Sequence, residues 1–251
     1  MGPPAAALLA LLVAAGCTDI SGGGPAEESG ARELLIVVYD RSMSISDHQL
    51  EHAEDVTRDL VDQLDHGDRV VAMDVLERGL DDAPRRWSQE VPDRRFHDRE
   101  AERDSVRRSR FLRDVRQYLE RYTDAADRGS RDGNNILATM HLVQEELDSY
   151  SDHRPRLVIF SDMLQDGYEI AMEGLADMPS DDWIPTEVER GGLPDLDDLC
   201  VVVVGARDDL RSNRAIRDWW IEYFEATGAD LRVDNWKHRP ASLPTEPCPA
   251  G

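Results

Sequence analysis

The sequence predicts an α/β fold, namely a doubly wound, mostly parallel sheet flanked by helices on both faces (a three-layer sandwich). Two observations predict it. Continuous apolar runs of strand length recur along the chain, and stretches with the spacing of amphipathic helices lie between them. Runs that are apolar at every position are typical of central parallel strands, which helices cover on both faces. The alternation of strands and helices favours a doubly wound sheet.

Five apolar runs predict the strands. Residues 34–39, 157–160 and 199–204 are apolar throughout and predict central strands. Residues 69–75 include polar positions and predict a more peripheral strand, and residues 231–233 predict an edge strand.

Four helices are expected between these strands. Residues 47–66 place aliphatic side chains on one face, and Gly67 stands where a helix C-terminus favours a left-handed residue. Residues 98–122 and 135–147 repeat the helical spacing, and residues 216–224 predict the last helix.

The N-terminal region differs from the rest of the chain. Residues 1–16 carry no charged side chain, end in small residues, and are shorter than the ~20 residues of a membrane-spanning helix, so they predict an export signal peptide. Cys17 follows directly, and Ala14-Ala15-Gly16-Cys17 resembles the lipobox of bacterial lipoproteins, whose cysteine is acylated. The resemblance implies a lipid anchor at the periplasmic face of the cell envelope, and Asp19 favours the outer membrane. An ordinary secretory signal with an incidental cysteine is the alternative.

Composition marks the remaining boundaries. Residues 17–32 are rich in Gly and acid and predict a flexible tether after the lipidated Cys17. Residues 33–236 are expected to form one domain, with an acidic insertion at 163–199, and residues 237–251 form a Pro-rich tail.

Charge and cysteine usage limit the class of protein. The chain has 29 basic and 52 acidic residues, a net charge of −23, so nucleic acid is not expected as a partner. Cys200 and Cys248 form an even pair once Cys17 is lipidated, which makes a disulfide plausible outside the cytoplasm. There is no CxxC motif or Cys/His cluster, so the sequence does not support a zinc site.

Oxygen-bearing side chains follow two of the central runs. Asp40, Ser42 and Ser44 form a DxSxS pattern after the first strand, and Asp162 comes after the run 157–160. In doubly wound sheets, ligands bind at the carboxyl ends of the strands, and hard oxygens of this kind suit Mg²⁺, Mn²⁺ or Ca²⁺. The alternative is that Asp40 caps the next helix and the two serines bond local backbone groups.

These residues resemble the von Willebrand factor type A family, whose metal-ion-dependent adhesion site joins a DxSxS turn to a Thr and a later Asp. Asp162 matches the later Asp, and the resemblance covers residues 33–236. At the Thr position this chain has Asn134, which can coordinate through its amide oxygen but is larger than Thr. The resemblance implies a metal site made of Asp40, Ser42, Ser44, Asn134 and Asp162.

The same resemblance implies binding rather than catalysis. In the family, a carboxylate from a protein partner fills the open position of the metal. A metal-free, degenerate domain acting as an envelope scaffold is the main alternative. A phosphohydrolase using Asp40 is a more distant one, because Ser42 stands where that chemistry would want a second Asp.

Two charged segments leave their roles open. The acidic segment 163–199 is expected to border the metal as a partner-selecting rim, or to be only a solvated insertion. The arginine-rich segment 98–122 is expected to be a self-paired solvated helix face, or a surface that contacts anionic lipid or an acidic partner.

Overall fold

A computed structural model gives the fold of the chain. Residues 31–251 form one compact unit. The predictions for the signal peptide, Cys17 and most of the tether lie outside the described residues. Only the backbone of residues 101–104, 122 and 123 is described. The structure describes residues 31–42, 44–77, 80, 85–92, 101–123, 134–167, 170–172, 177–243 and 248.

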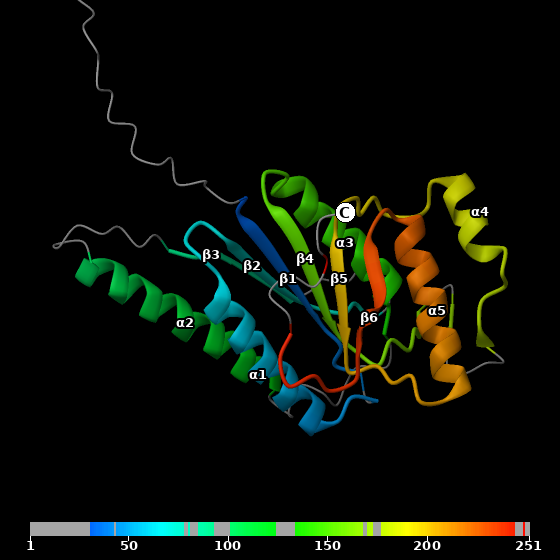
Figure 1. The fold of residues 1–251 in the computed structure, drawn as a ribbon, viewed down its shortest axis with the longest axis horizontal. Helices are drawn as coiled ribbons and strands as arrows, with labels where there is room; N and C mark the ends of the chain where they lie inside the picture. Colours follow the sequence, from blue (N-terminus) through cyan, green and yellow to red (C-terminus); the bar gives the residue numbers. More distant parts are fainter. Residues whose placement is uncertain are drawn as a thin grey trace, which may run out of the picture. The chain divides into compact units, whose positions relative to one another are not determined.

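Six strands form one sheet in the order β3-β2-β1-β4-β5-β6 (Figure 1). All neighbouring strands are parallel except β2 and β3, which are antiparallel. The predicted doubly wound, mostly parallel sheet is therefore confirmed. The strands are β1 (Glu33–Tyr39), β2 (Arg69–Asp74), β3 (Arg86–Glu90), β4 (Arg154–Phe160), β5 (Cys200–Val204) and β6 (Asp230–Lys237).

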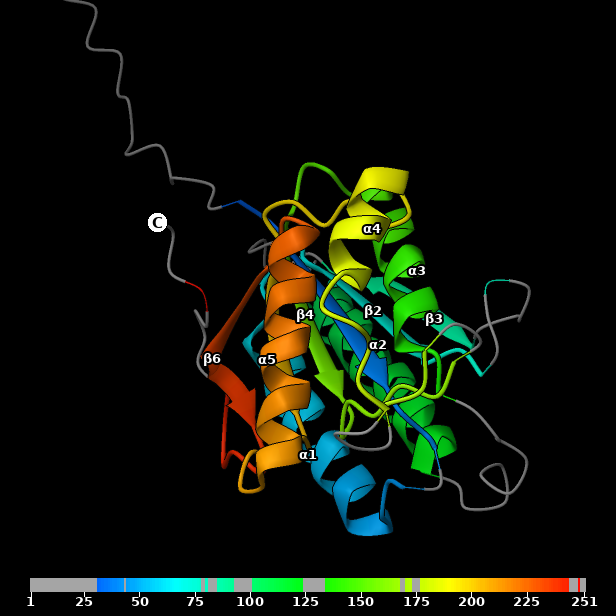
Figure 2. The same ribbon diagram turned by 90° about the vertical axis from the view of Figure 1, so that its right-hand side faces the viewer.

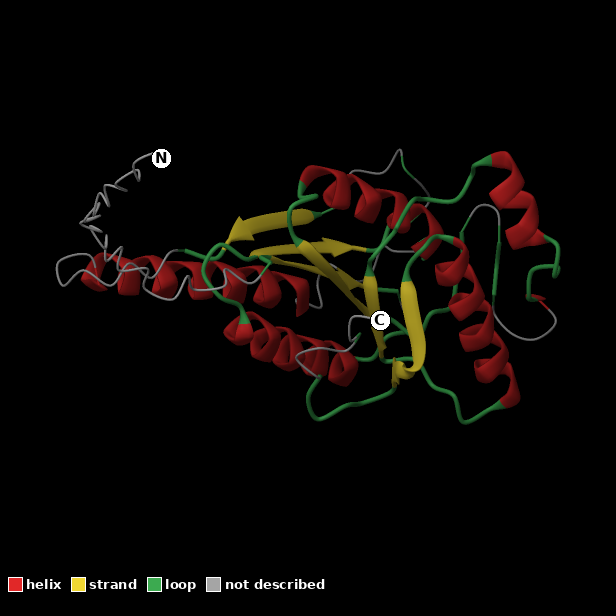
Figure 3. Ribbon diagram, turned by 45° about the horizontal axis from the view of Figure 1, so that its top comes forward, coloured by secondary structure: helices red, strands yellow, loops and turns green. Residues whose placement is uncertain are grey.

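Helices cover both faces of this sheet (Figures 2 and 3). The helices α1 and α2 pack on one face, and α3 and α5 pack on the other, with α4 beside α5. The bounds are α1 (Asp47–Gln63), α2 (Ala101–Thr123), α3 (Ile136–Ser149), α4 (Trp183–Arg190) and α5 (Arg211–Ala226).

Strand β1 explains why a central strand is apolar at every position. Leu34, Ile36 and Val38 enter the core under α3 and α5. Alternate residues, among them Leu35 and Val37, enter the core under α1 and α2. All of these side chains are fully buried, because successive side chains of a strand point to opposite faces and both faces are covered.

Two elements were not predicted. Strand β3 is polar and alternates between exposed and half-buried residues, because it lies at the edge of the sheet. Helix α4 lies inside the segment 163–199, which the sequence predicted only as an acidic insertion. Helix α1 ends at Gln63, so Gly67, with φ of +85°, serves the turn into β2 rather than the helix end.

The two central strands place the candidate site. The chain leaves β1 toward α1 and β2 on one side, whereas it leaves β4 toward β5 on the other, so the strand order reverses between them. Tyr39 at the end of β1 pairs in register with Phe160 at the end of β4. The backbone N–H of Asp40 donates to the carbonyl of Phe160 at 2.9 Å, which holds the two following loops together.

The opposite end of the sheet carries a disulfide. Cys200, the first residue of β5, is bonded to Cys248 with an S–S distance of 2.04 Å. The structure thus joins the two cysteines that the sequence suggested as a pair. Among the described residues, no helix is long and apolar enough to cross a membrane.

Candidate functional site

The carboxylate of Asp40 is the centre of the site. Its side chain follows β1 and the residue is only 1% exposed. The Oδ1 atom accepts the backbone N–H of Ser42 at 2.8 Å. The Oδ2 atom accepts the Ser161 hydroxyl and the Asn134 amide, both at 2.6 Å. Three donors from three segments therefore fix the orientation of this carboxylate.

The two serines of the DxSxS turn connect Asp40 to the loop after β4. The Oγ atoms of Ser42 and Ser44 are 2.9 Å apart. Ser44 also forms a side-chain hydrogen bond with Asp162, whose Oδ1 accepts the backbone N–H of Leu164 at 3.1 Å. The structure thus brings together all five residues that the sequence predicted as metal ligands.

Burial makes both carboxylates difficult to ionise together. Burial and the nearby charge of Asp162 raise the pKa of Asp40 to about 6, although hydrogen bonds from Ser161 and Ser42 oppose the change. Burial also raises the pKa of Asp162, and the hydrogen bond with Ser44 partly offsets it. Ionising both of these neighbouring carboxylates, one buried and one half-buried, costs free energy, and a bound cation would relieve that cost.

Asn134 contacts Asp40 through its nitrogen and not its oxygen. Its Nδ2 donates to Asp40 and also to the carbonyl of Leu164 at 2.8 Å. Its Oδ1 is buried and has no hydrogen-bond partner among the described residues. The backbone of Asn134 is held by two hydrogen bonds with Asp166. Coordination of a metal by Asn134 would therefore require the amide to present its oxygen instead.

A buried ion pair holds the DxSxS turn against the end of β2. Arg41 lies between Asp40 and Ser42 in the chain, and its guanidinium is 3.5 Å from the carboxylate of Asp74 at the end of β2. Both side chains are almost completely buried, at 1% and 3% exposure. Removing one partner of such a pair leaves an uncompensated buried charge, so this pair fixes the path of the turn.

The loop after β4 is held by α5. Met163 directly follows Asp162 and has φ of +63°, a left-handed conformation that is unfavourable for a residue with a side chain. The indole Nε1 of Trp220 donates to the carbonyl of Met163 at 3.0 Å. The Ser161 hydroxyl accepts the N–H of Met163 at 2.8 Å.

The described residues of the acidic segment 163–199 lie at both ends of the sheet. Gln165 is buried beside the site, where its Oε1 accepts the N–H of Ile136 at 2.8 Å and so helps to cap α3. The second half, including α4, lies at the other end of the sheet, where the N–H of Leu196 donates to the carbonyl of Thr227 (Figures 1 and 2). Of the residues of this segment that the structure describes, the first ones, including Leu164 and Gln165, border the candidate site.

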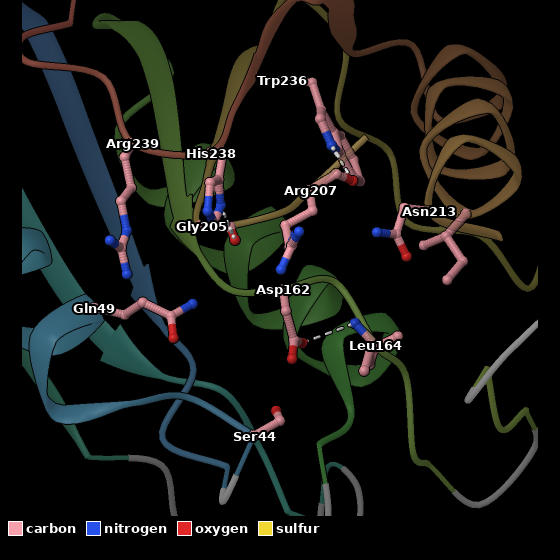
Figure 4. Close-up of a pocket in the computed structure, with 11 residues that line it drawn as sticks. Ser44, Gln49, Asp162, Leu164, Gly205, Arg207, Asn213, Trp236, His238 and Arg239 are labelled. Atoms are coloured by element: carbon pink, nitrogen blue, oxygen red, sulfur yellow. Dashed lines mark hydrogen bonds between the residues drawn. The ribbon is translucent and has the colours of Figure 1, made fainter. Parts of the chain in front are cut away.

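A cavity of about 340 Å³ opens beside Ser44 and Asp162 (Figure 4). It lies where the ends of β4, β5 and β6 meet the first turns of α1 and α5. Gly205 at the end of β5 has φ of +109°, and a Cβ there would lie 3.0 Å from the carbonyl oxygen of Ser161. The other lining residues are Gln49, Leu164, Arg207, Asn213, Ile216, Trp236, His238 and Arg239.

Ser161 and the cationic residues of the cavity were not predicted as site residues. Each follows the carboxyl end of a strand, the position at which the rule that identified Asp40 and Asp162 looks for ligand-binding residues. Among the described residues, no three His, Cys, Asp or Glu side chains cluster as a metal site. A cation bound at this place would depend on two carboxylates together with hydroxyl and amide oxygens.

Comparisons with known proteins add little to this geometry. No protein-family model and no curated protein sequence matches the chain. Among solved structures, the fold is similar to proximal thread matrix protein 1 from the mussel byssus, with 11% sequence identity and a TM-score of 0.39. The match covers 69% of this chain and 38% of the mussel protein. A similarity of this size carries no inference about function.

Proposed function

We propose that this protein is a membrane-anchored lipoprotein whose von Willebrand factor A-like domain binds a protein partner through a divalent cation. One observation supports it above the others. A buried carboxylate, Asp40, and a half-buried one, Asp162, lie with two serine hydroxyls at the point where the strand order reverses. The charge of one carboxylate raises the pKa of the other, which is the situation that a cation stabilises.

The residues present fit a hard cation. Carboxylate and hydroxyl oxygens are the ligands that Mg²⁺, Mn²⁺ and Ca²⁺ prefer. Asp40, Ser42, Ser44 and Asp162 would hold the ion, and Asn134 would add its amide oxygen after reorientation. The cation would supply an open coordination position for a carboxylate of the partner. Asp162 is half-buried and borders the cavity, so a partner group can approach from that side.

The lipid anchor would determine where the protein meets its partner. An acylated Cys17 followed by the tether would hold the domain close to the membrane, at the periplasmic face of the cell envelope and preferably at the outer membrane. The site would then face soluble or membrane-bound proteins of the same compartment.

Calorimetry tests the metal site directly. Mg²⁺ and Mn²⁺ are titrated into residues 18–251 and into the Asp40→Asn variant. Asp68→Asn is a matched control, because Asp68 is also a buried carboxylate that accepts backbone N–H groups, but it lies at the other end of β1, where it bonds Glu33. Saturable binding that Asp40→Asn removes and Asp68→Asn retains is the expected result. No heat of binding in any of the three proteins would refute the metal site.

One observation favours the second candidate, a metal-free scaffold. The Nδ2 of Asn134 already neutralises part of the Asp40 carboxylate through a 2.6 Å hydrogen bond. A donor in that place competes with a cation for the same oxygen. If calorimetry gives no binding, the domain would act through its surface alone, and this hydrogen bond would be the reason.

A further inference from the structure

The cavity beside Asp162 is cationic although the protein is strongly acidic. The chain has a net charge of −23. Two arginines, Arg207 and Arg239, and the imidazole of His238 nevertheless line the cavity, against one acidic residue, Asp162. If a metal ion neutralises that carboxylate, the remaining charge of the cavity is positive.

Arg207 is held in place without being withdrawn from the cavity. It comes two residues after Gly205, at the end of β5, and its Nε and Nη2 both donate to the carboxylate of Asp209. Asp209 in turn accepts the amide of Asn213 in the first turn of α5 at 3.2 Å. The side chain of Arg207 remains 59% exposed and extends toward Asp162 (Figure 4). Its guanidinium therefore keeps donors for a ligand.

The two other basic residues, His238 and Arg239, come directly after β6. The ring of His238 is positioned by a 3.1 Å contact between its Nδ1 and the carbonyl of Gly205. Arg239 is exposed and forms no ion pair with a carboxylate in the part of the chain that the structure describes, and its guanidinium extends toward Gln49 (Figure 4).

The first turn of α5 adds to the positive potential. No side chain caps this helix, because Leu210 stands at the N-cap position. The first-turn N–H groups of a helix carry partial positive charge, and Asn213 of this turn lines the cavity together with Arg207.

We propose that this cavity is an anion subsite that takes an acidic side chain of the protein partner, next to the carboxylate that the metal takes. The inference rests on the proposed function, because it makes the partner's recognition element a pair of acidic residues. A volume of about 340 Å³ lies at the small end of ligand pockets, which suits one side chain and its bound water. Arginine pairs well with carboxylates, so the second acid would add both affinity and register.

Binding of short acidic peptides to residues 18–251 tests this inference. The probes are capped peptides with one Asp, and with a second Asp placed one, two or three positions later, each matched by a peptide with Asn at the second position. Affinities are measured by fluorescence anisotropy with Mg²⁺ and, separately, with a chelator. The variants are Arg207→Gln and Arg239→Gln. Arg232→Gln is the control, because Arg232 is also exposed and also pairs with an Asp two residues away, but it lies outside the cavity.

In Mg²⁺, we expect one two-Asp peptide to bind about tenfold more tightly than its Asn match, the size of a charge-assisted hydrogen bond. Arg207→Gln and Arg239→Gln should remove most of that difference while Mg²⁺ binding by calorimetry stays unchanged. Arg232→Gln should retain it.

Three outcomes would overturn the subsite. The first is equal affinity for each two-Asp peptide and the matched peptide with Asn at the second position. The second is an equal loss in all three arginine variants, which would indicate general charge attraction. The third is inorganic phosphate that binds through Arg207 while no peptide does. If Mg²⁺ fails to bind but the preference for two acids persists in chelator, the metal proposal fails and the subsite stands.

Discussion

The metal-free protein should lose stability as pH rises, because Asp40 is buried. Burial and the charge of Asp162 raise the pKa of Asp40 from 3.8 to about 6. The folded protein then holds this proton more tightly than the unfolded chain does. Protonation therefore stabilises the fold, fully below the unfolded pKa, and this contribution is lost as pH rises through about 6.

The size of the effect follows from the two pKa values. They lie about two pH units apart, and one unit corresponds to about 1.4 kcal/mol. The free energy of unfolding should therefore fall by up to ~3 kcal/mol between about pH 4 and about pH 7. Domains of this kind are stable by only about 5–15 kcal/mol, so the change is large enough to measure.

Urea unfolding in the presence of a chelator measures this pH-dependent change in the free energy of unfolding. The wild type and Asp40→Asn are compared across the same pH range. Many other carboxylates titrate there, but they cancel in the difference between the two proteins. Altered hydrogen bonds to Ser161 and Asn134 would shift the whole curve of the variant by a constant, whereas the titration of Asp40 changes its slope. Parallel curves for the two proteins would refute the reasoning.

Three further predictions concern residues around the carboxylate. Asn134→Thr removes the amide donor from Asp40 and should raise the affinity for Mg²⁺ several-fold by calorimetry, whereas unchanged affinity would show that the amide does not compete. Trp220→Phe removes the hydrogen bond to the carbonyl of Met163. It should lower the free energy of unfolding in urea by about 1–3 kcal/mol and also weaken Mg²⁺ binding. A loss of stability with unchanged Mg²⁺ binding would show that α5 does not position the site. Cys248→Ser removes the disulfide that closes a 48-residue loop and should lower the free energy of unfolding by up to ~4 kcal/mol. Mg²⁺ binding should stay unchanged, because the disulfide lies at the opposite end of the sheet. A loss of Mg²⁺ binding would show that the two ends are coupled.

The fold was predictable where hydrophobic pattern alone decides it. Leu34 to Tyr39 are apolar because both faces of β1 are covered, and that pattern is local. The polar strand β3 has no such signal, because its environment at the edge is set by pairing with β2. Helix α4 is short and lies among acidic residues, so its packing beside α5 is decided by contacts distant in sequence.

The candidate site was predictable in membership but not in detail. Asp40 and Asp162 follow central strands, and the rule that ligands collect at the carboxyl ends brings them together. The orientation of the Asn134 amide depends on the carbonyl of Leu164, which no sequence pattern near Asn134 indicates. The cavity needs the ends of two more strands, and the charge of Arg207 and Arg239 becomes informative only when they are seen to face one space.

The hydrogen bond between Trp220 and Met163 means that the site is not a portable motif. The residue that fixes the direction of the Asp162 loop stands 57 positions further along the chain, on a helix that contributes no ligand. Transplanting the DxSxS turn and the later Asp into another sheet would transfer the oxygen ligands but not the contacts that orient them. Substitutions in the buried face of α5 can therefore change the geometry of the site without any change in the residues that a motif search would inspect.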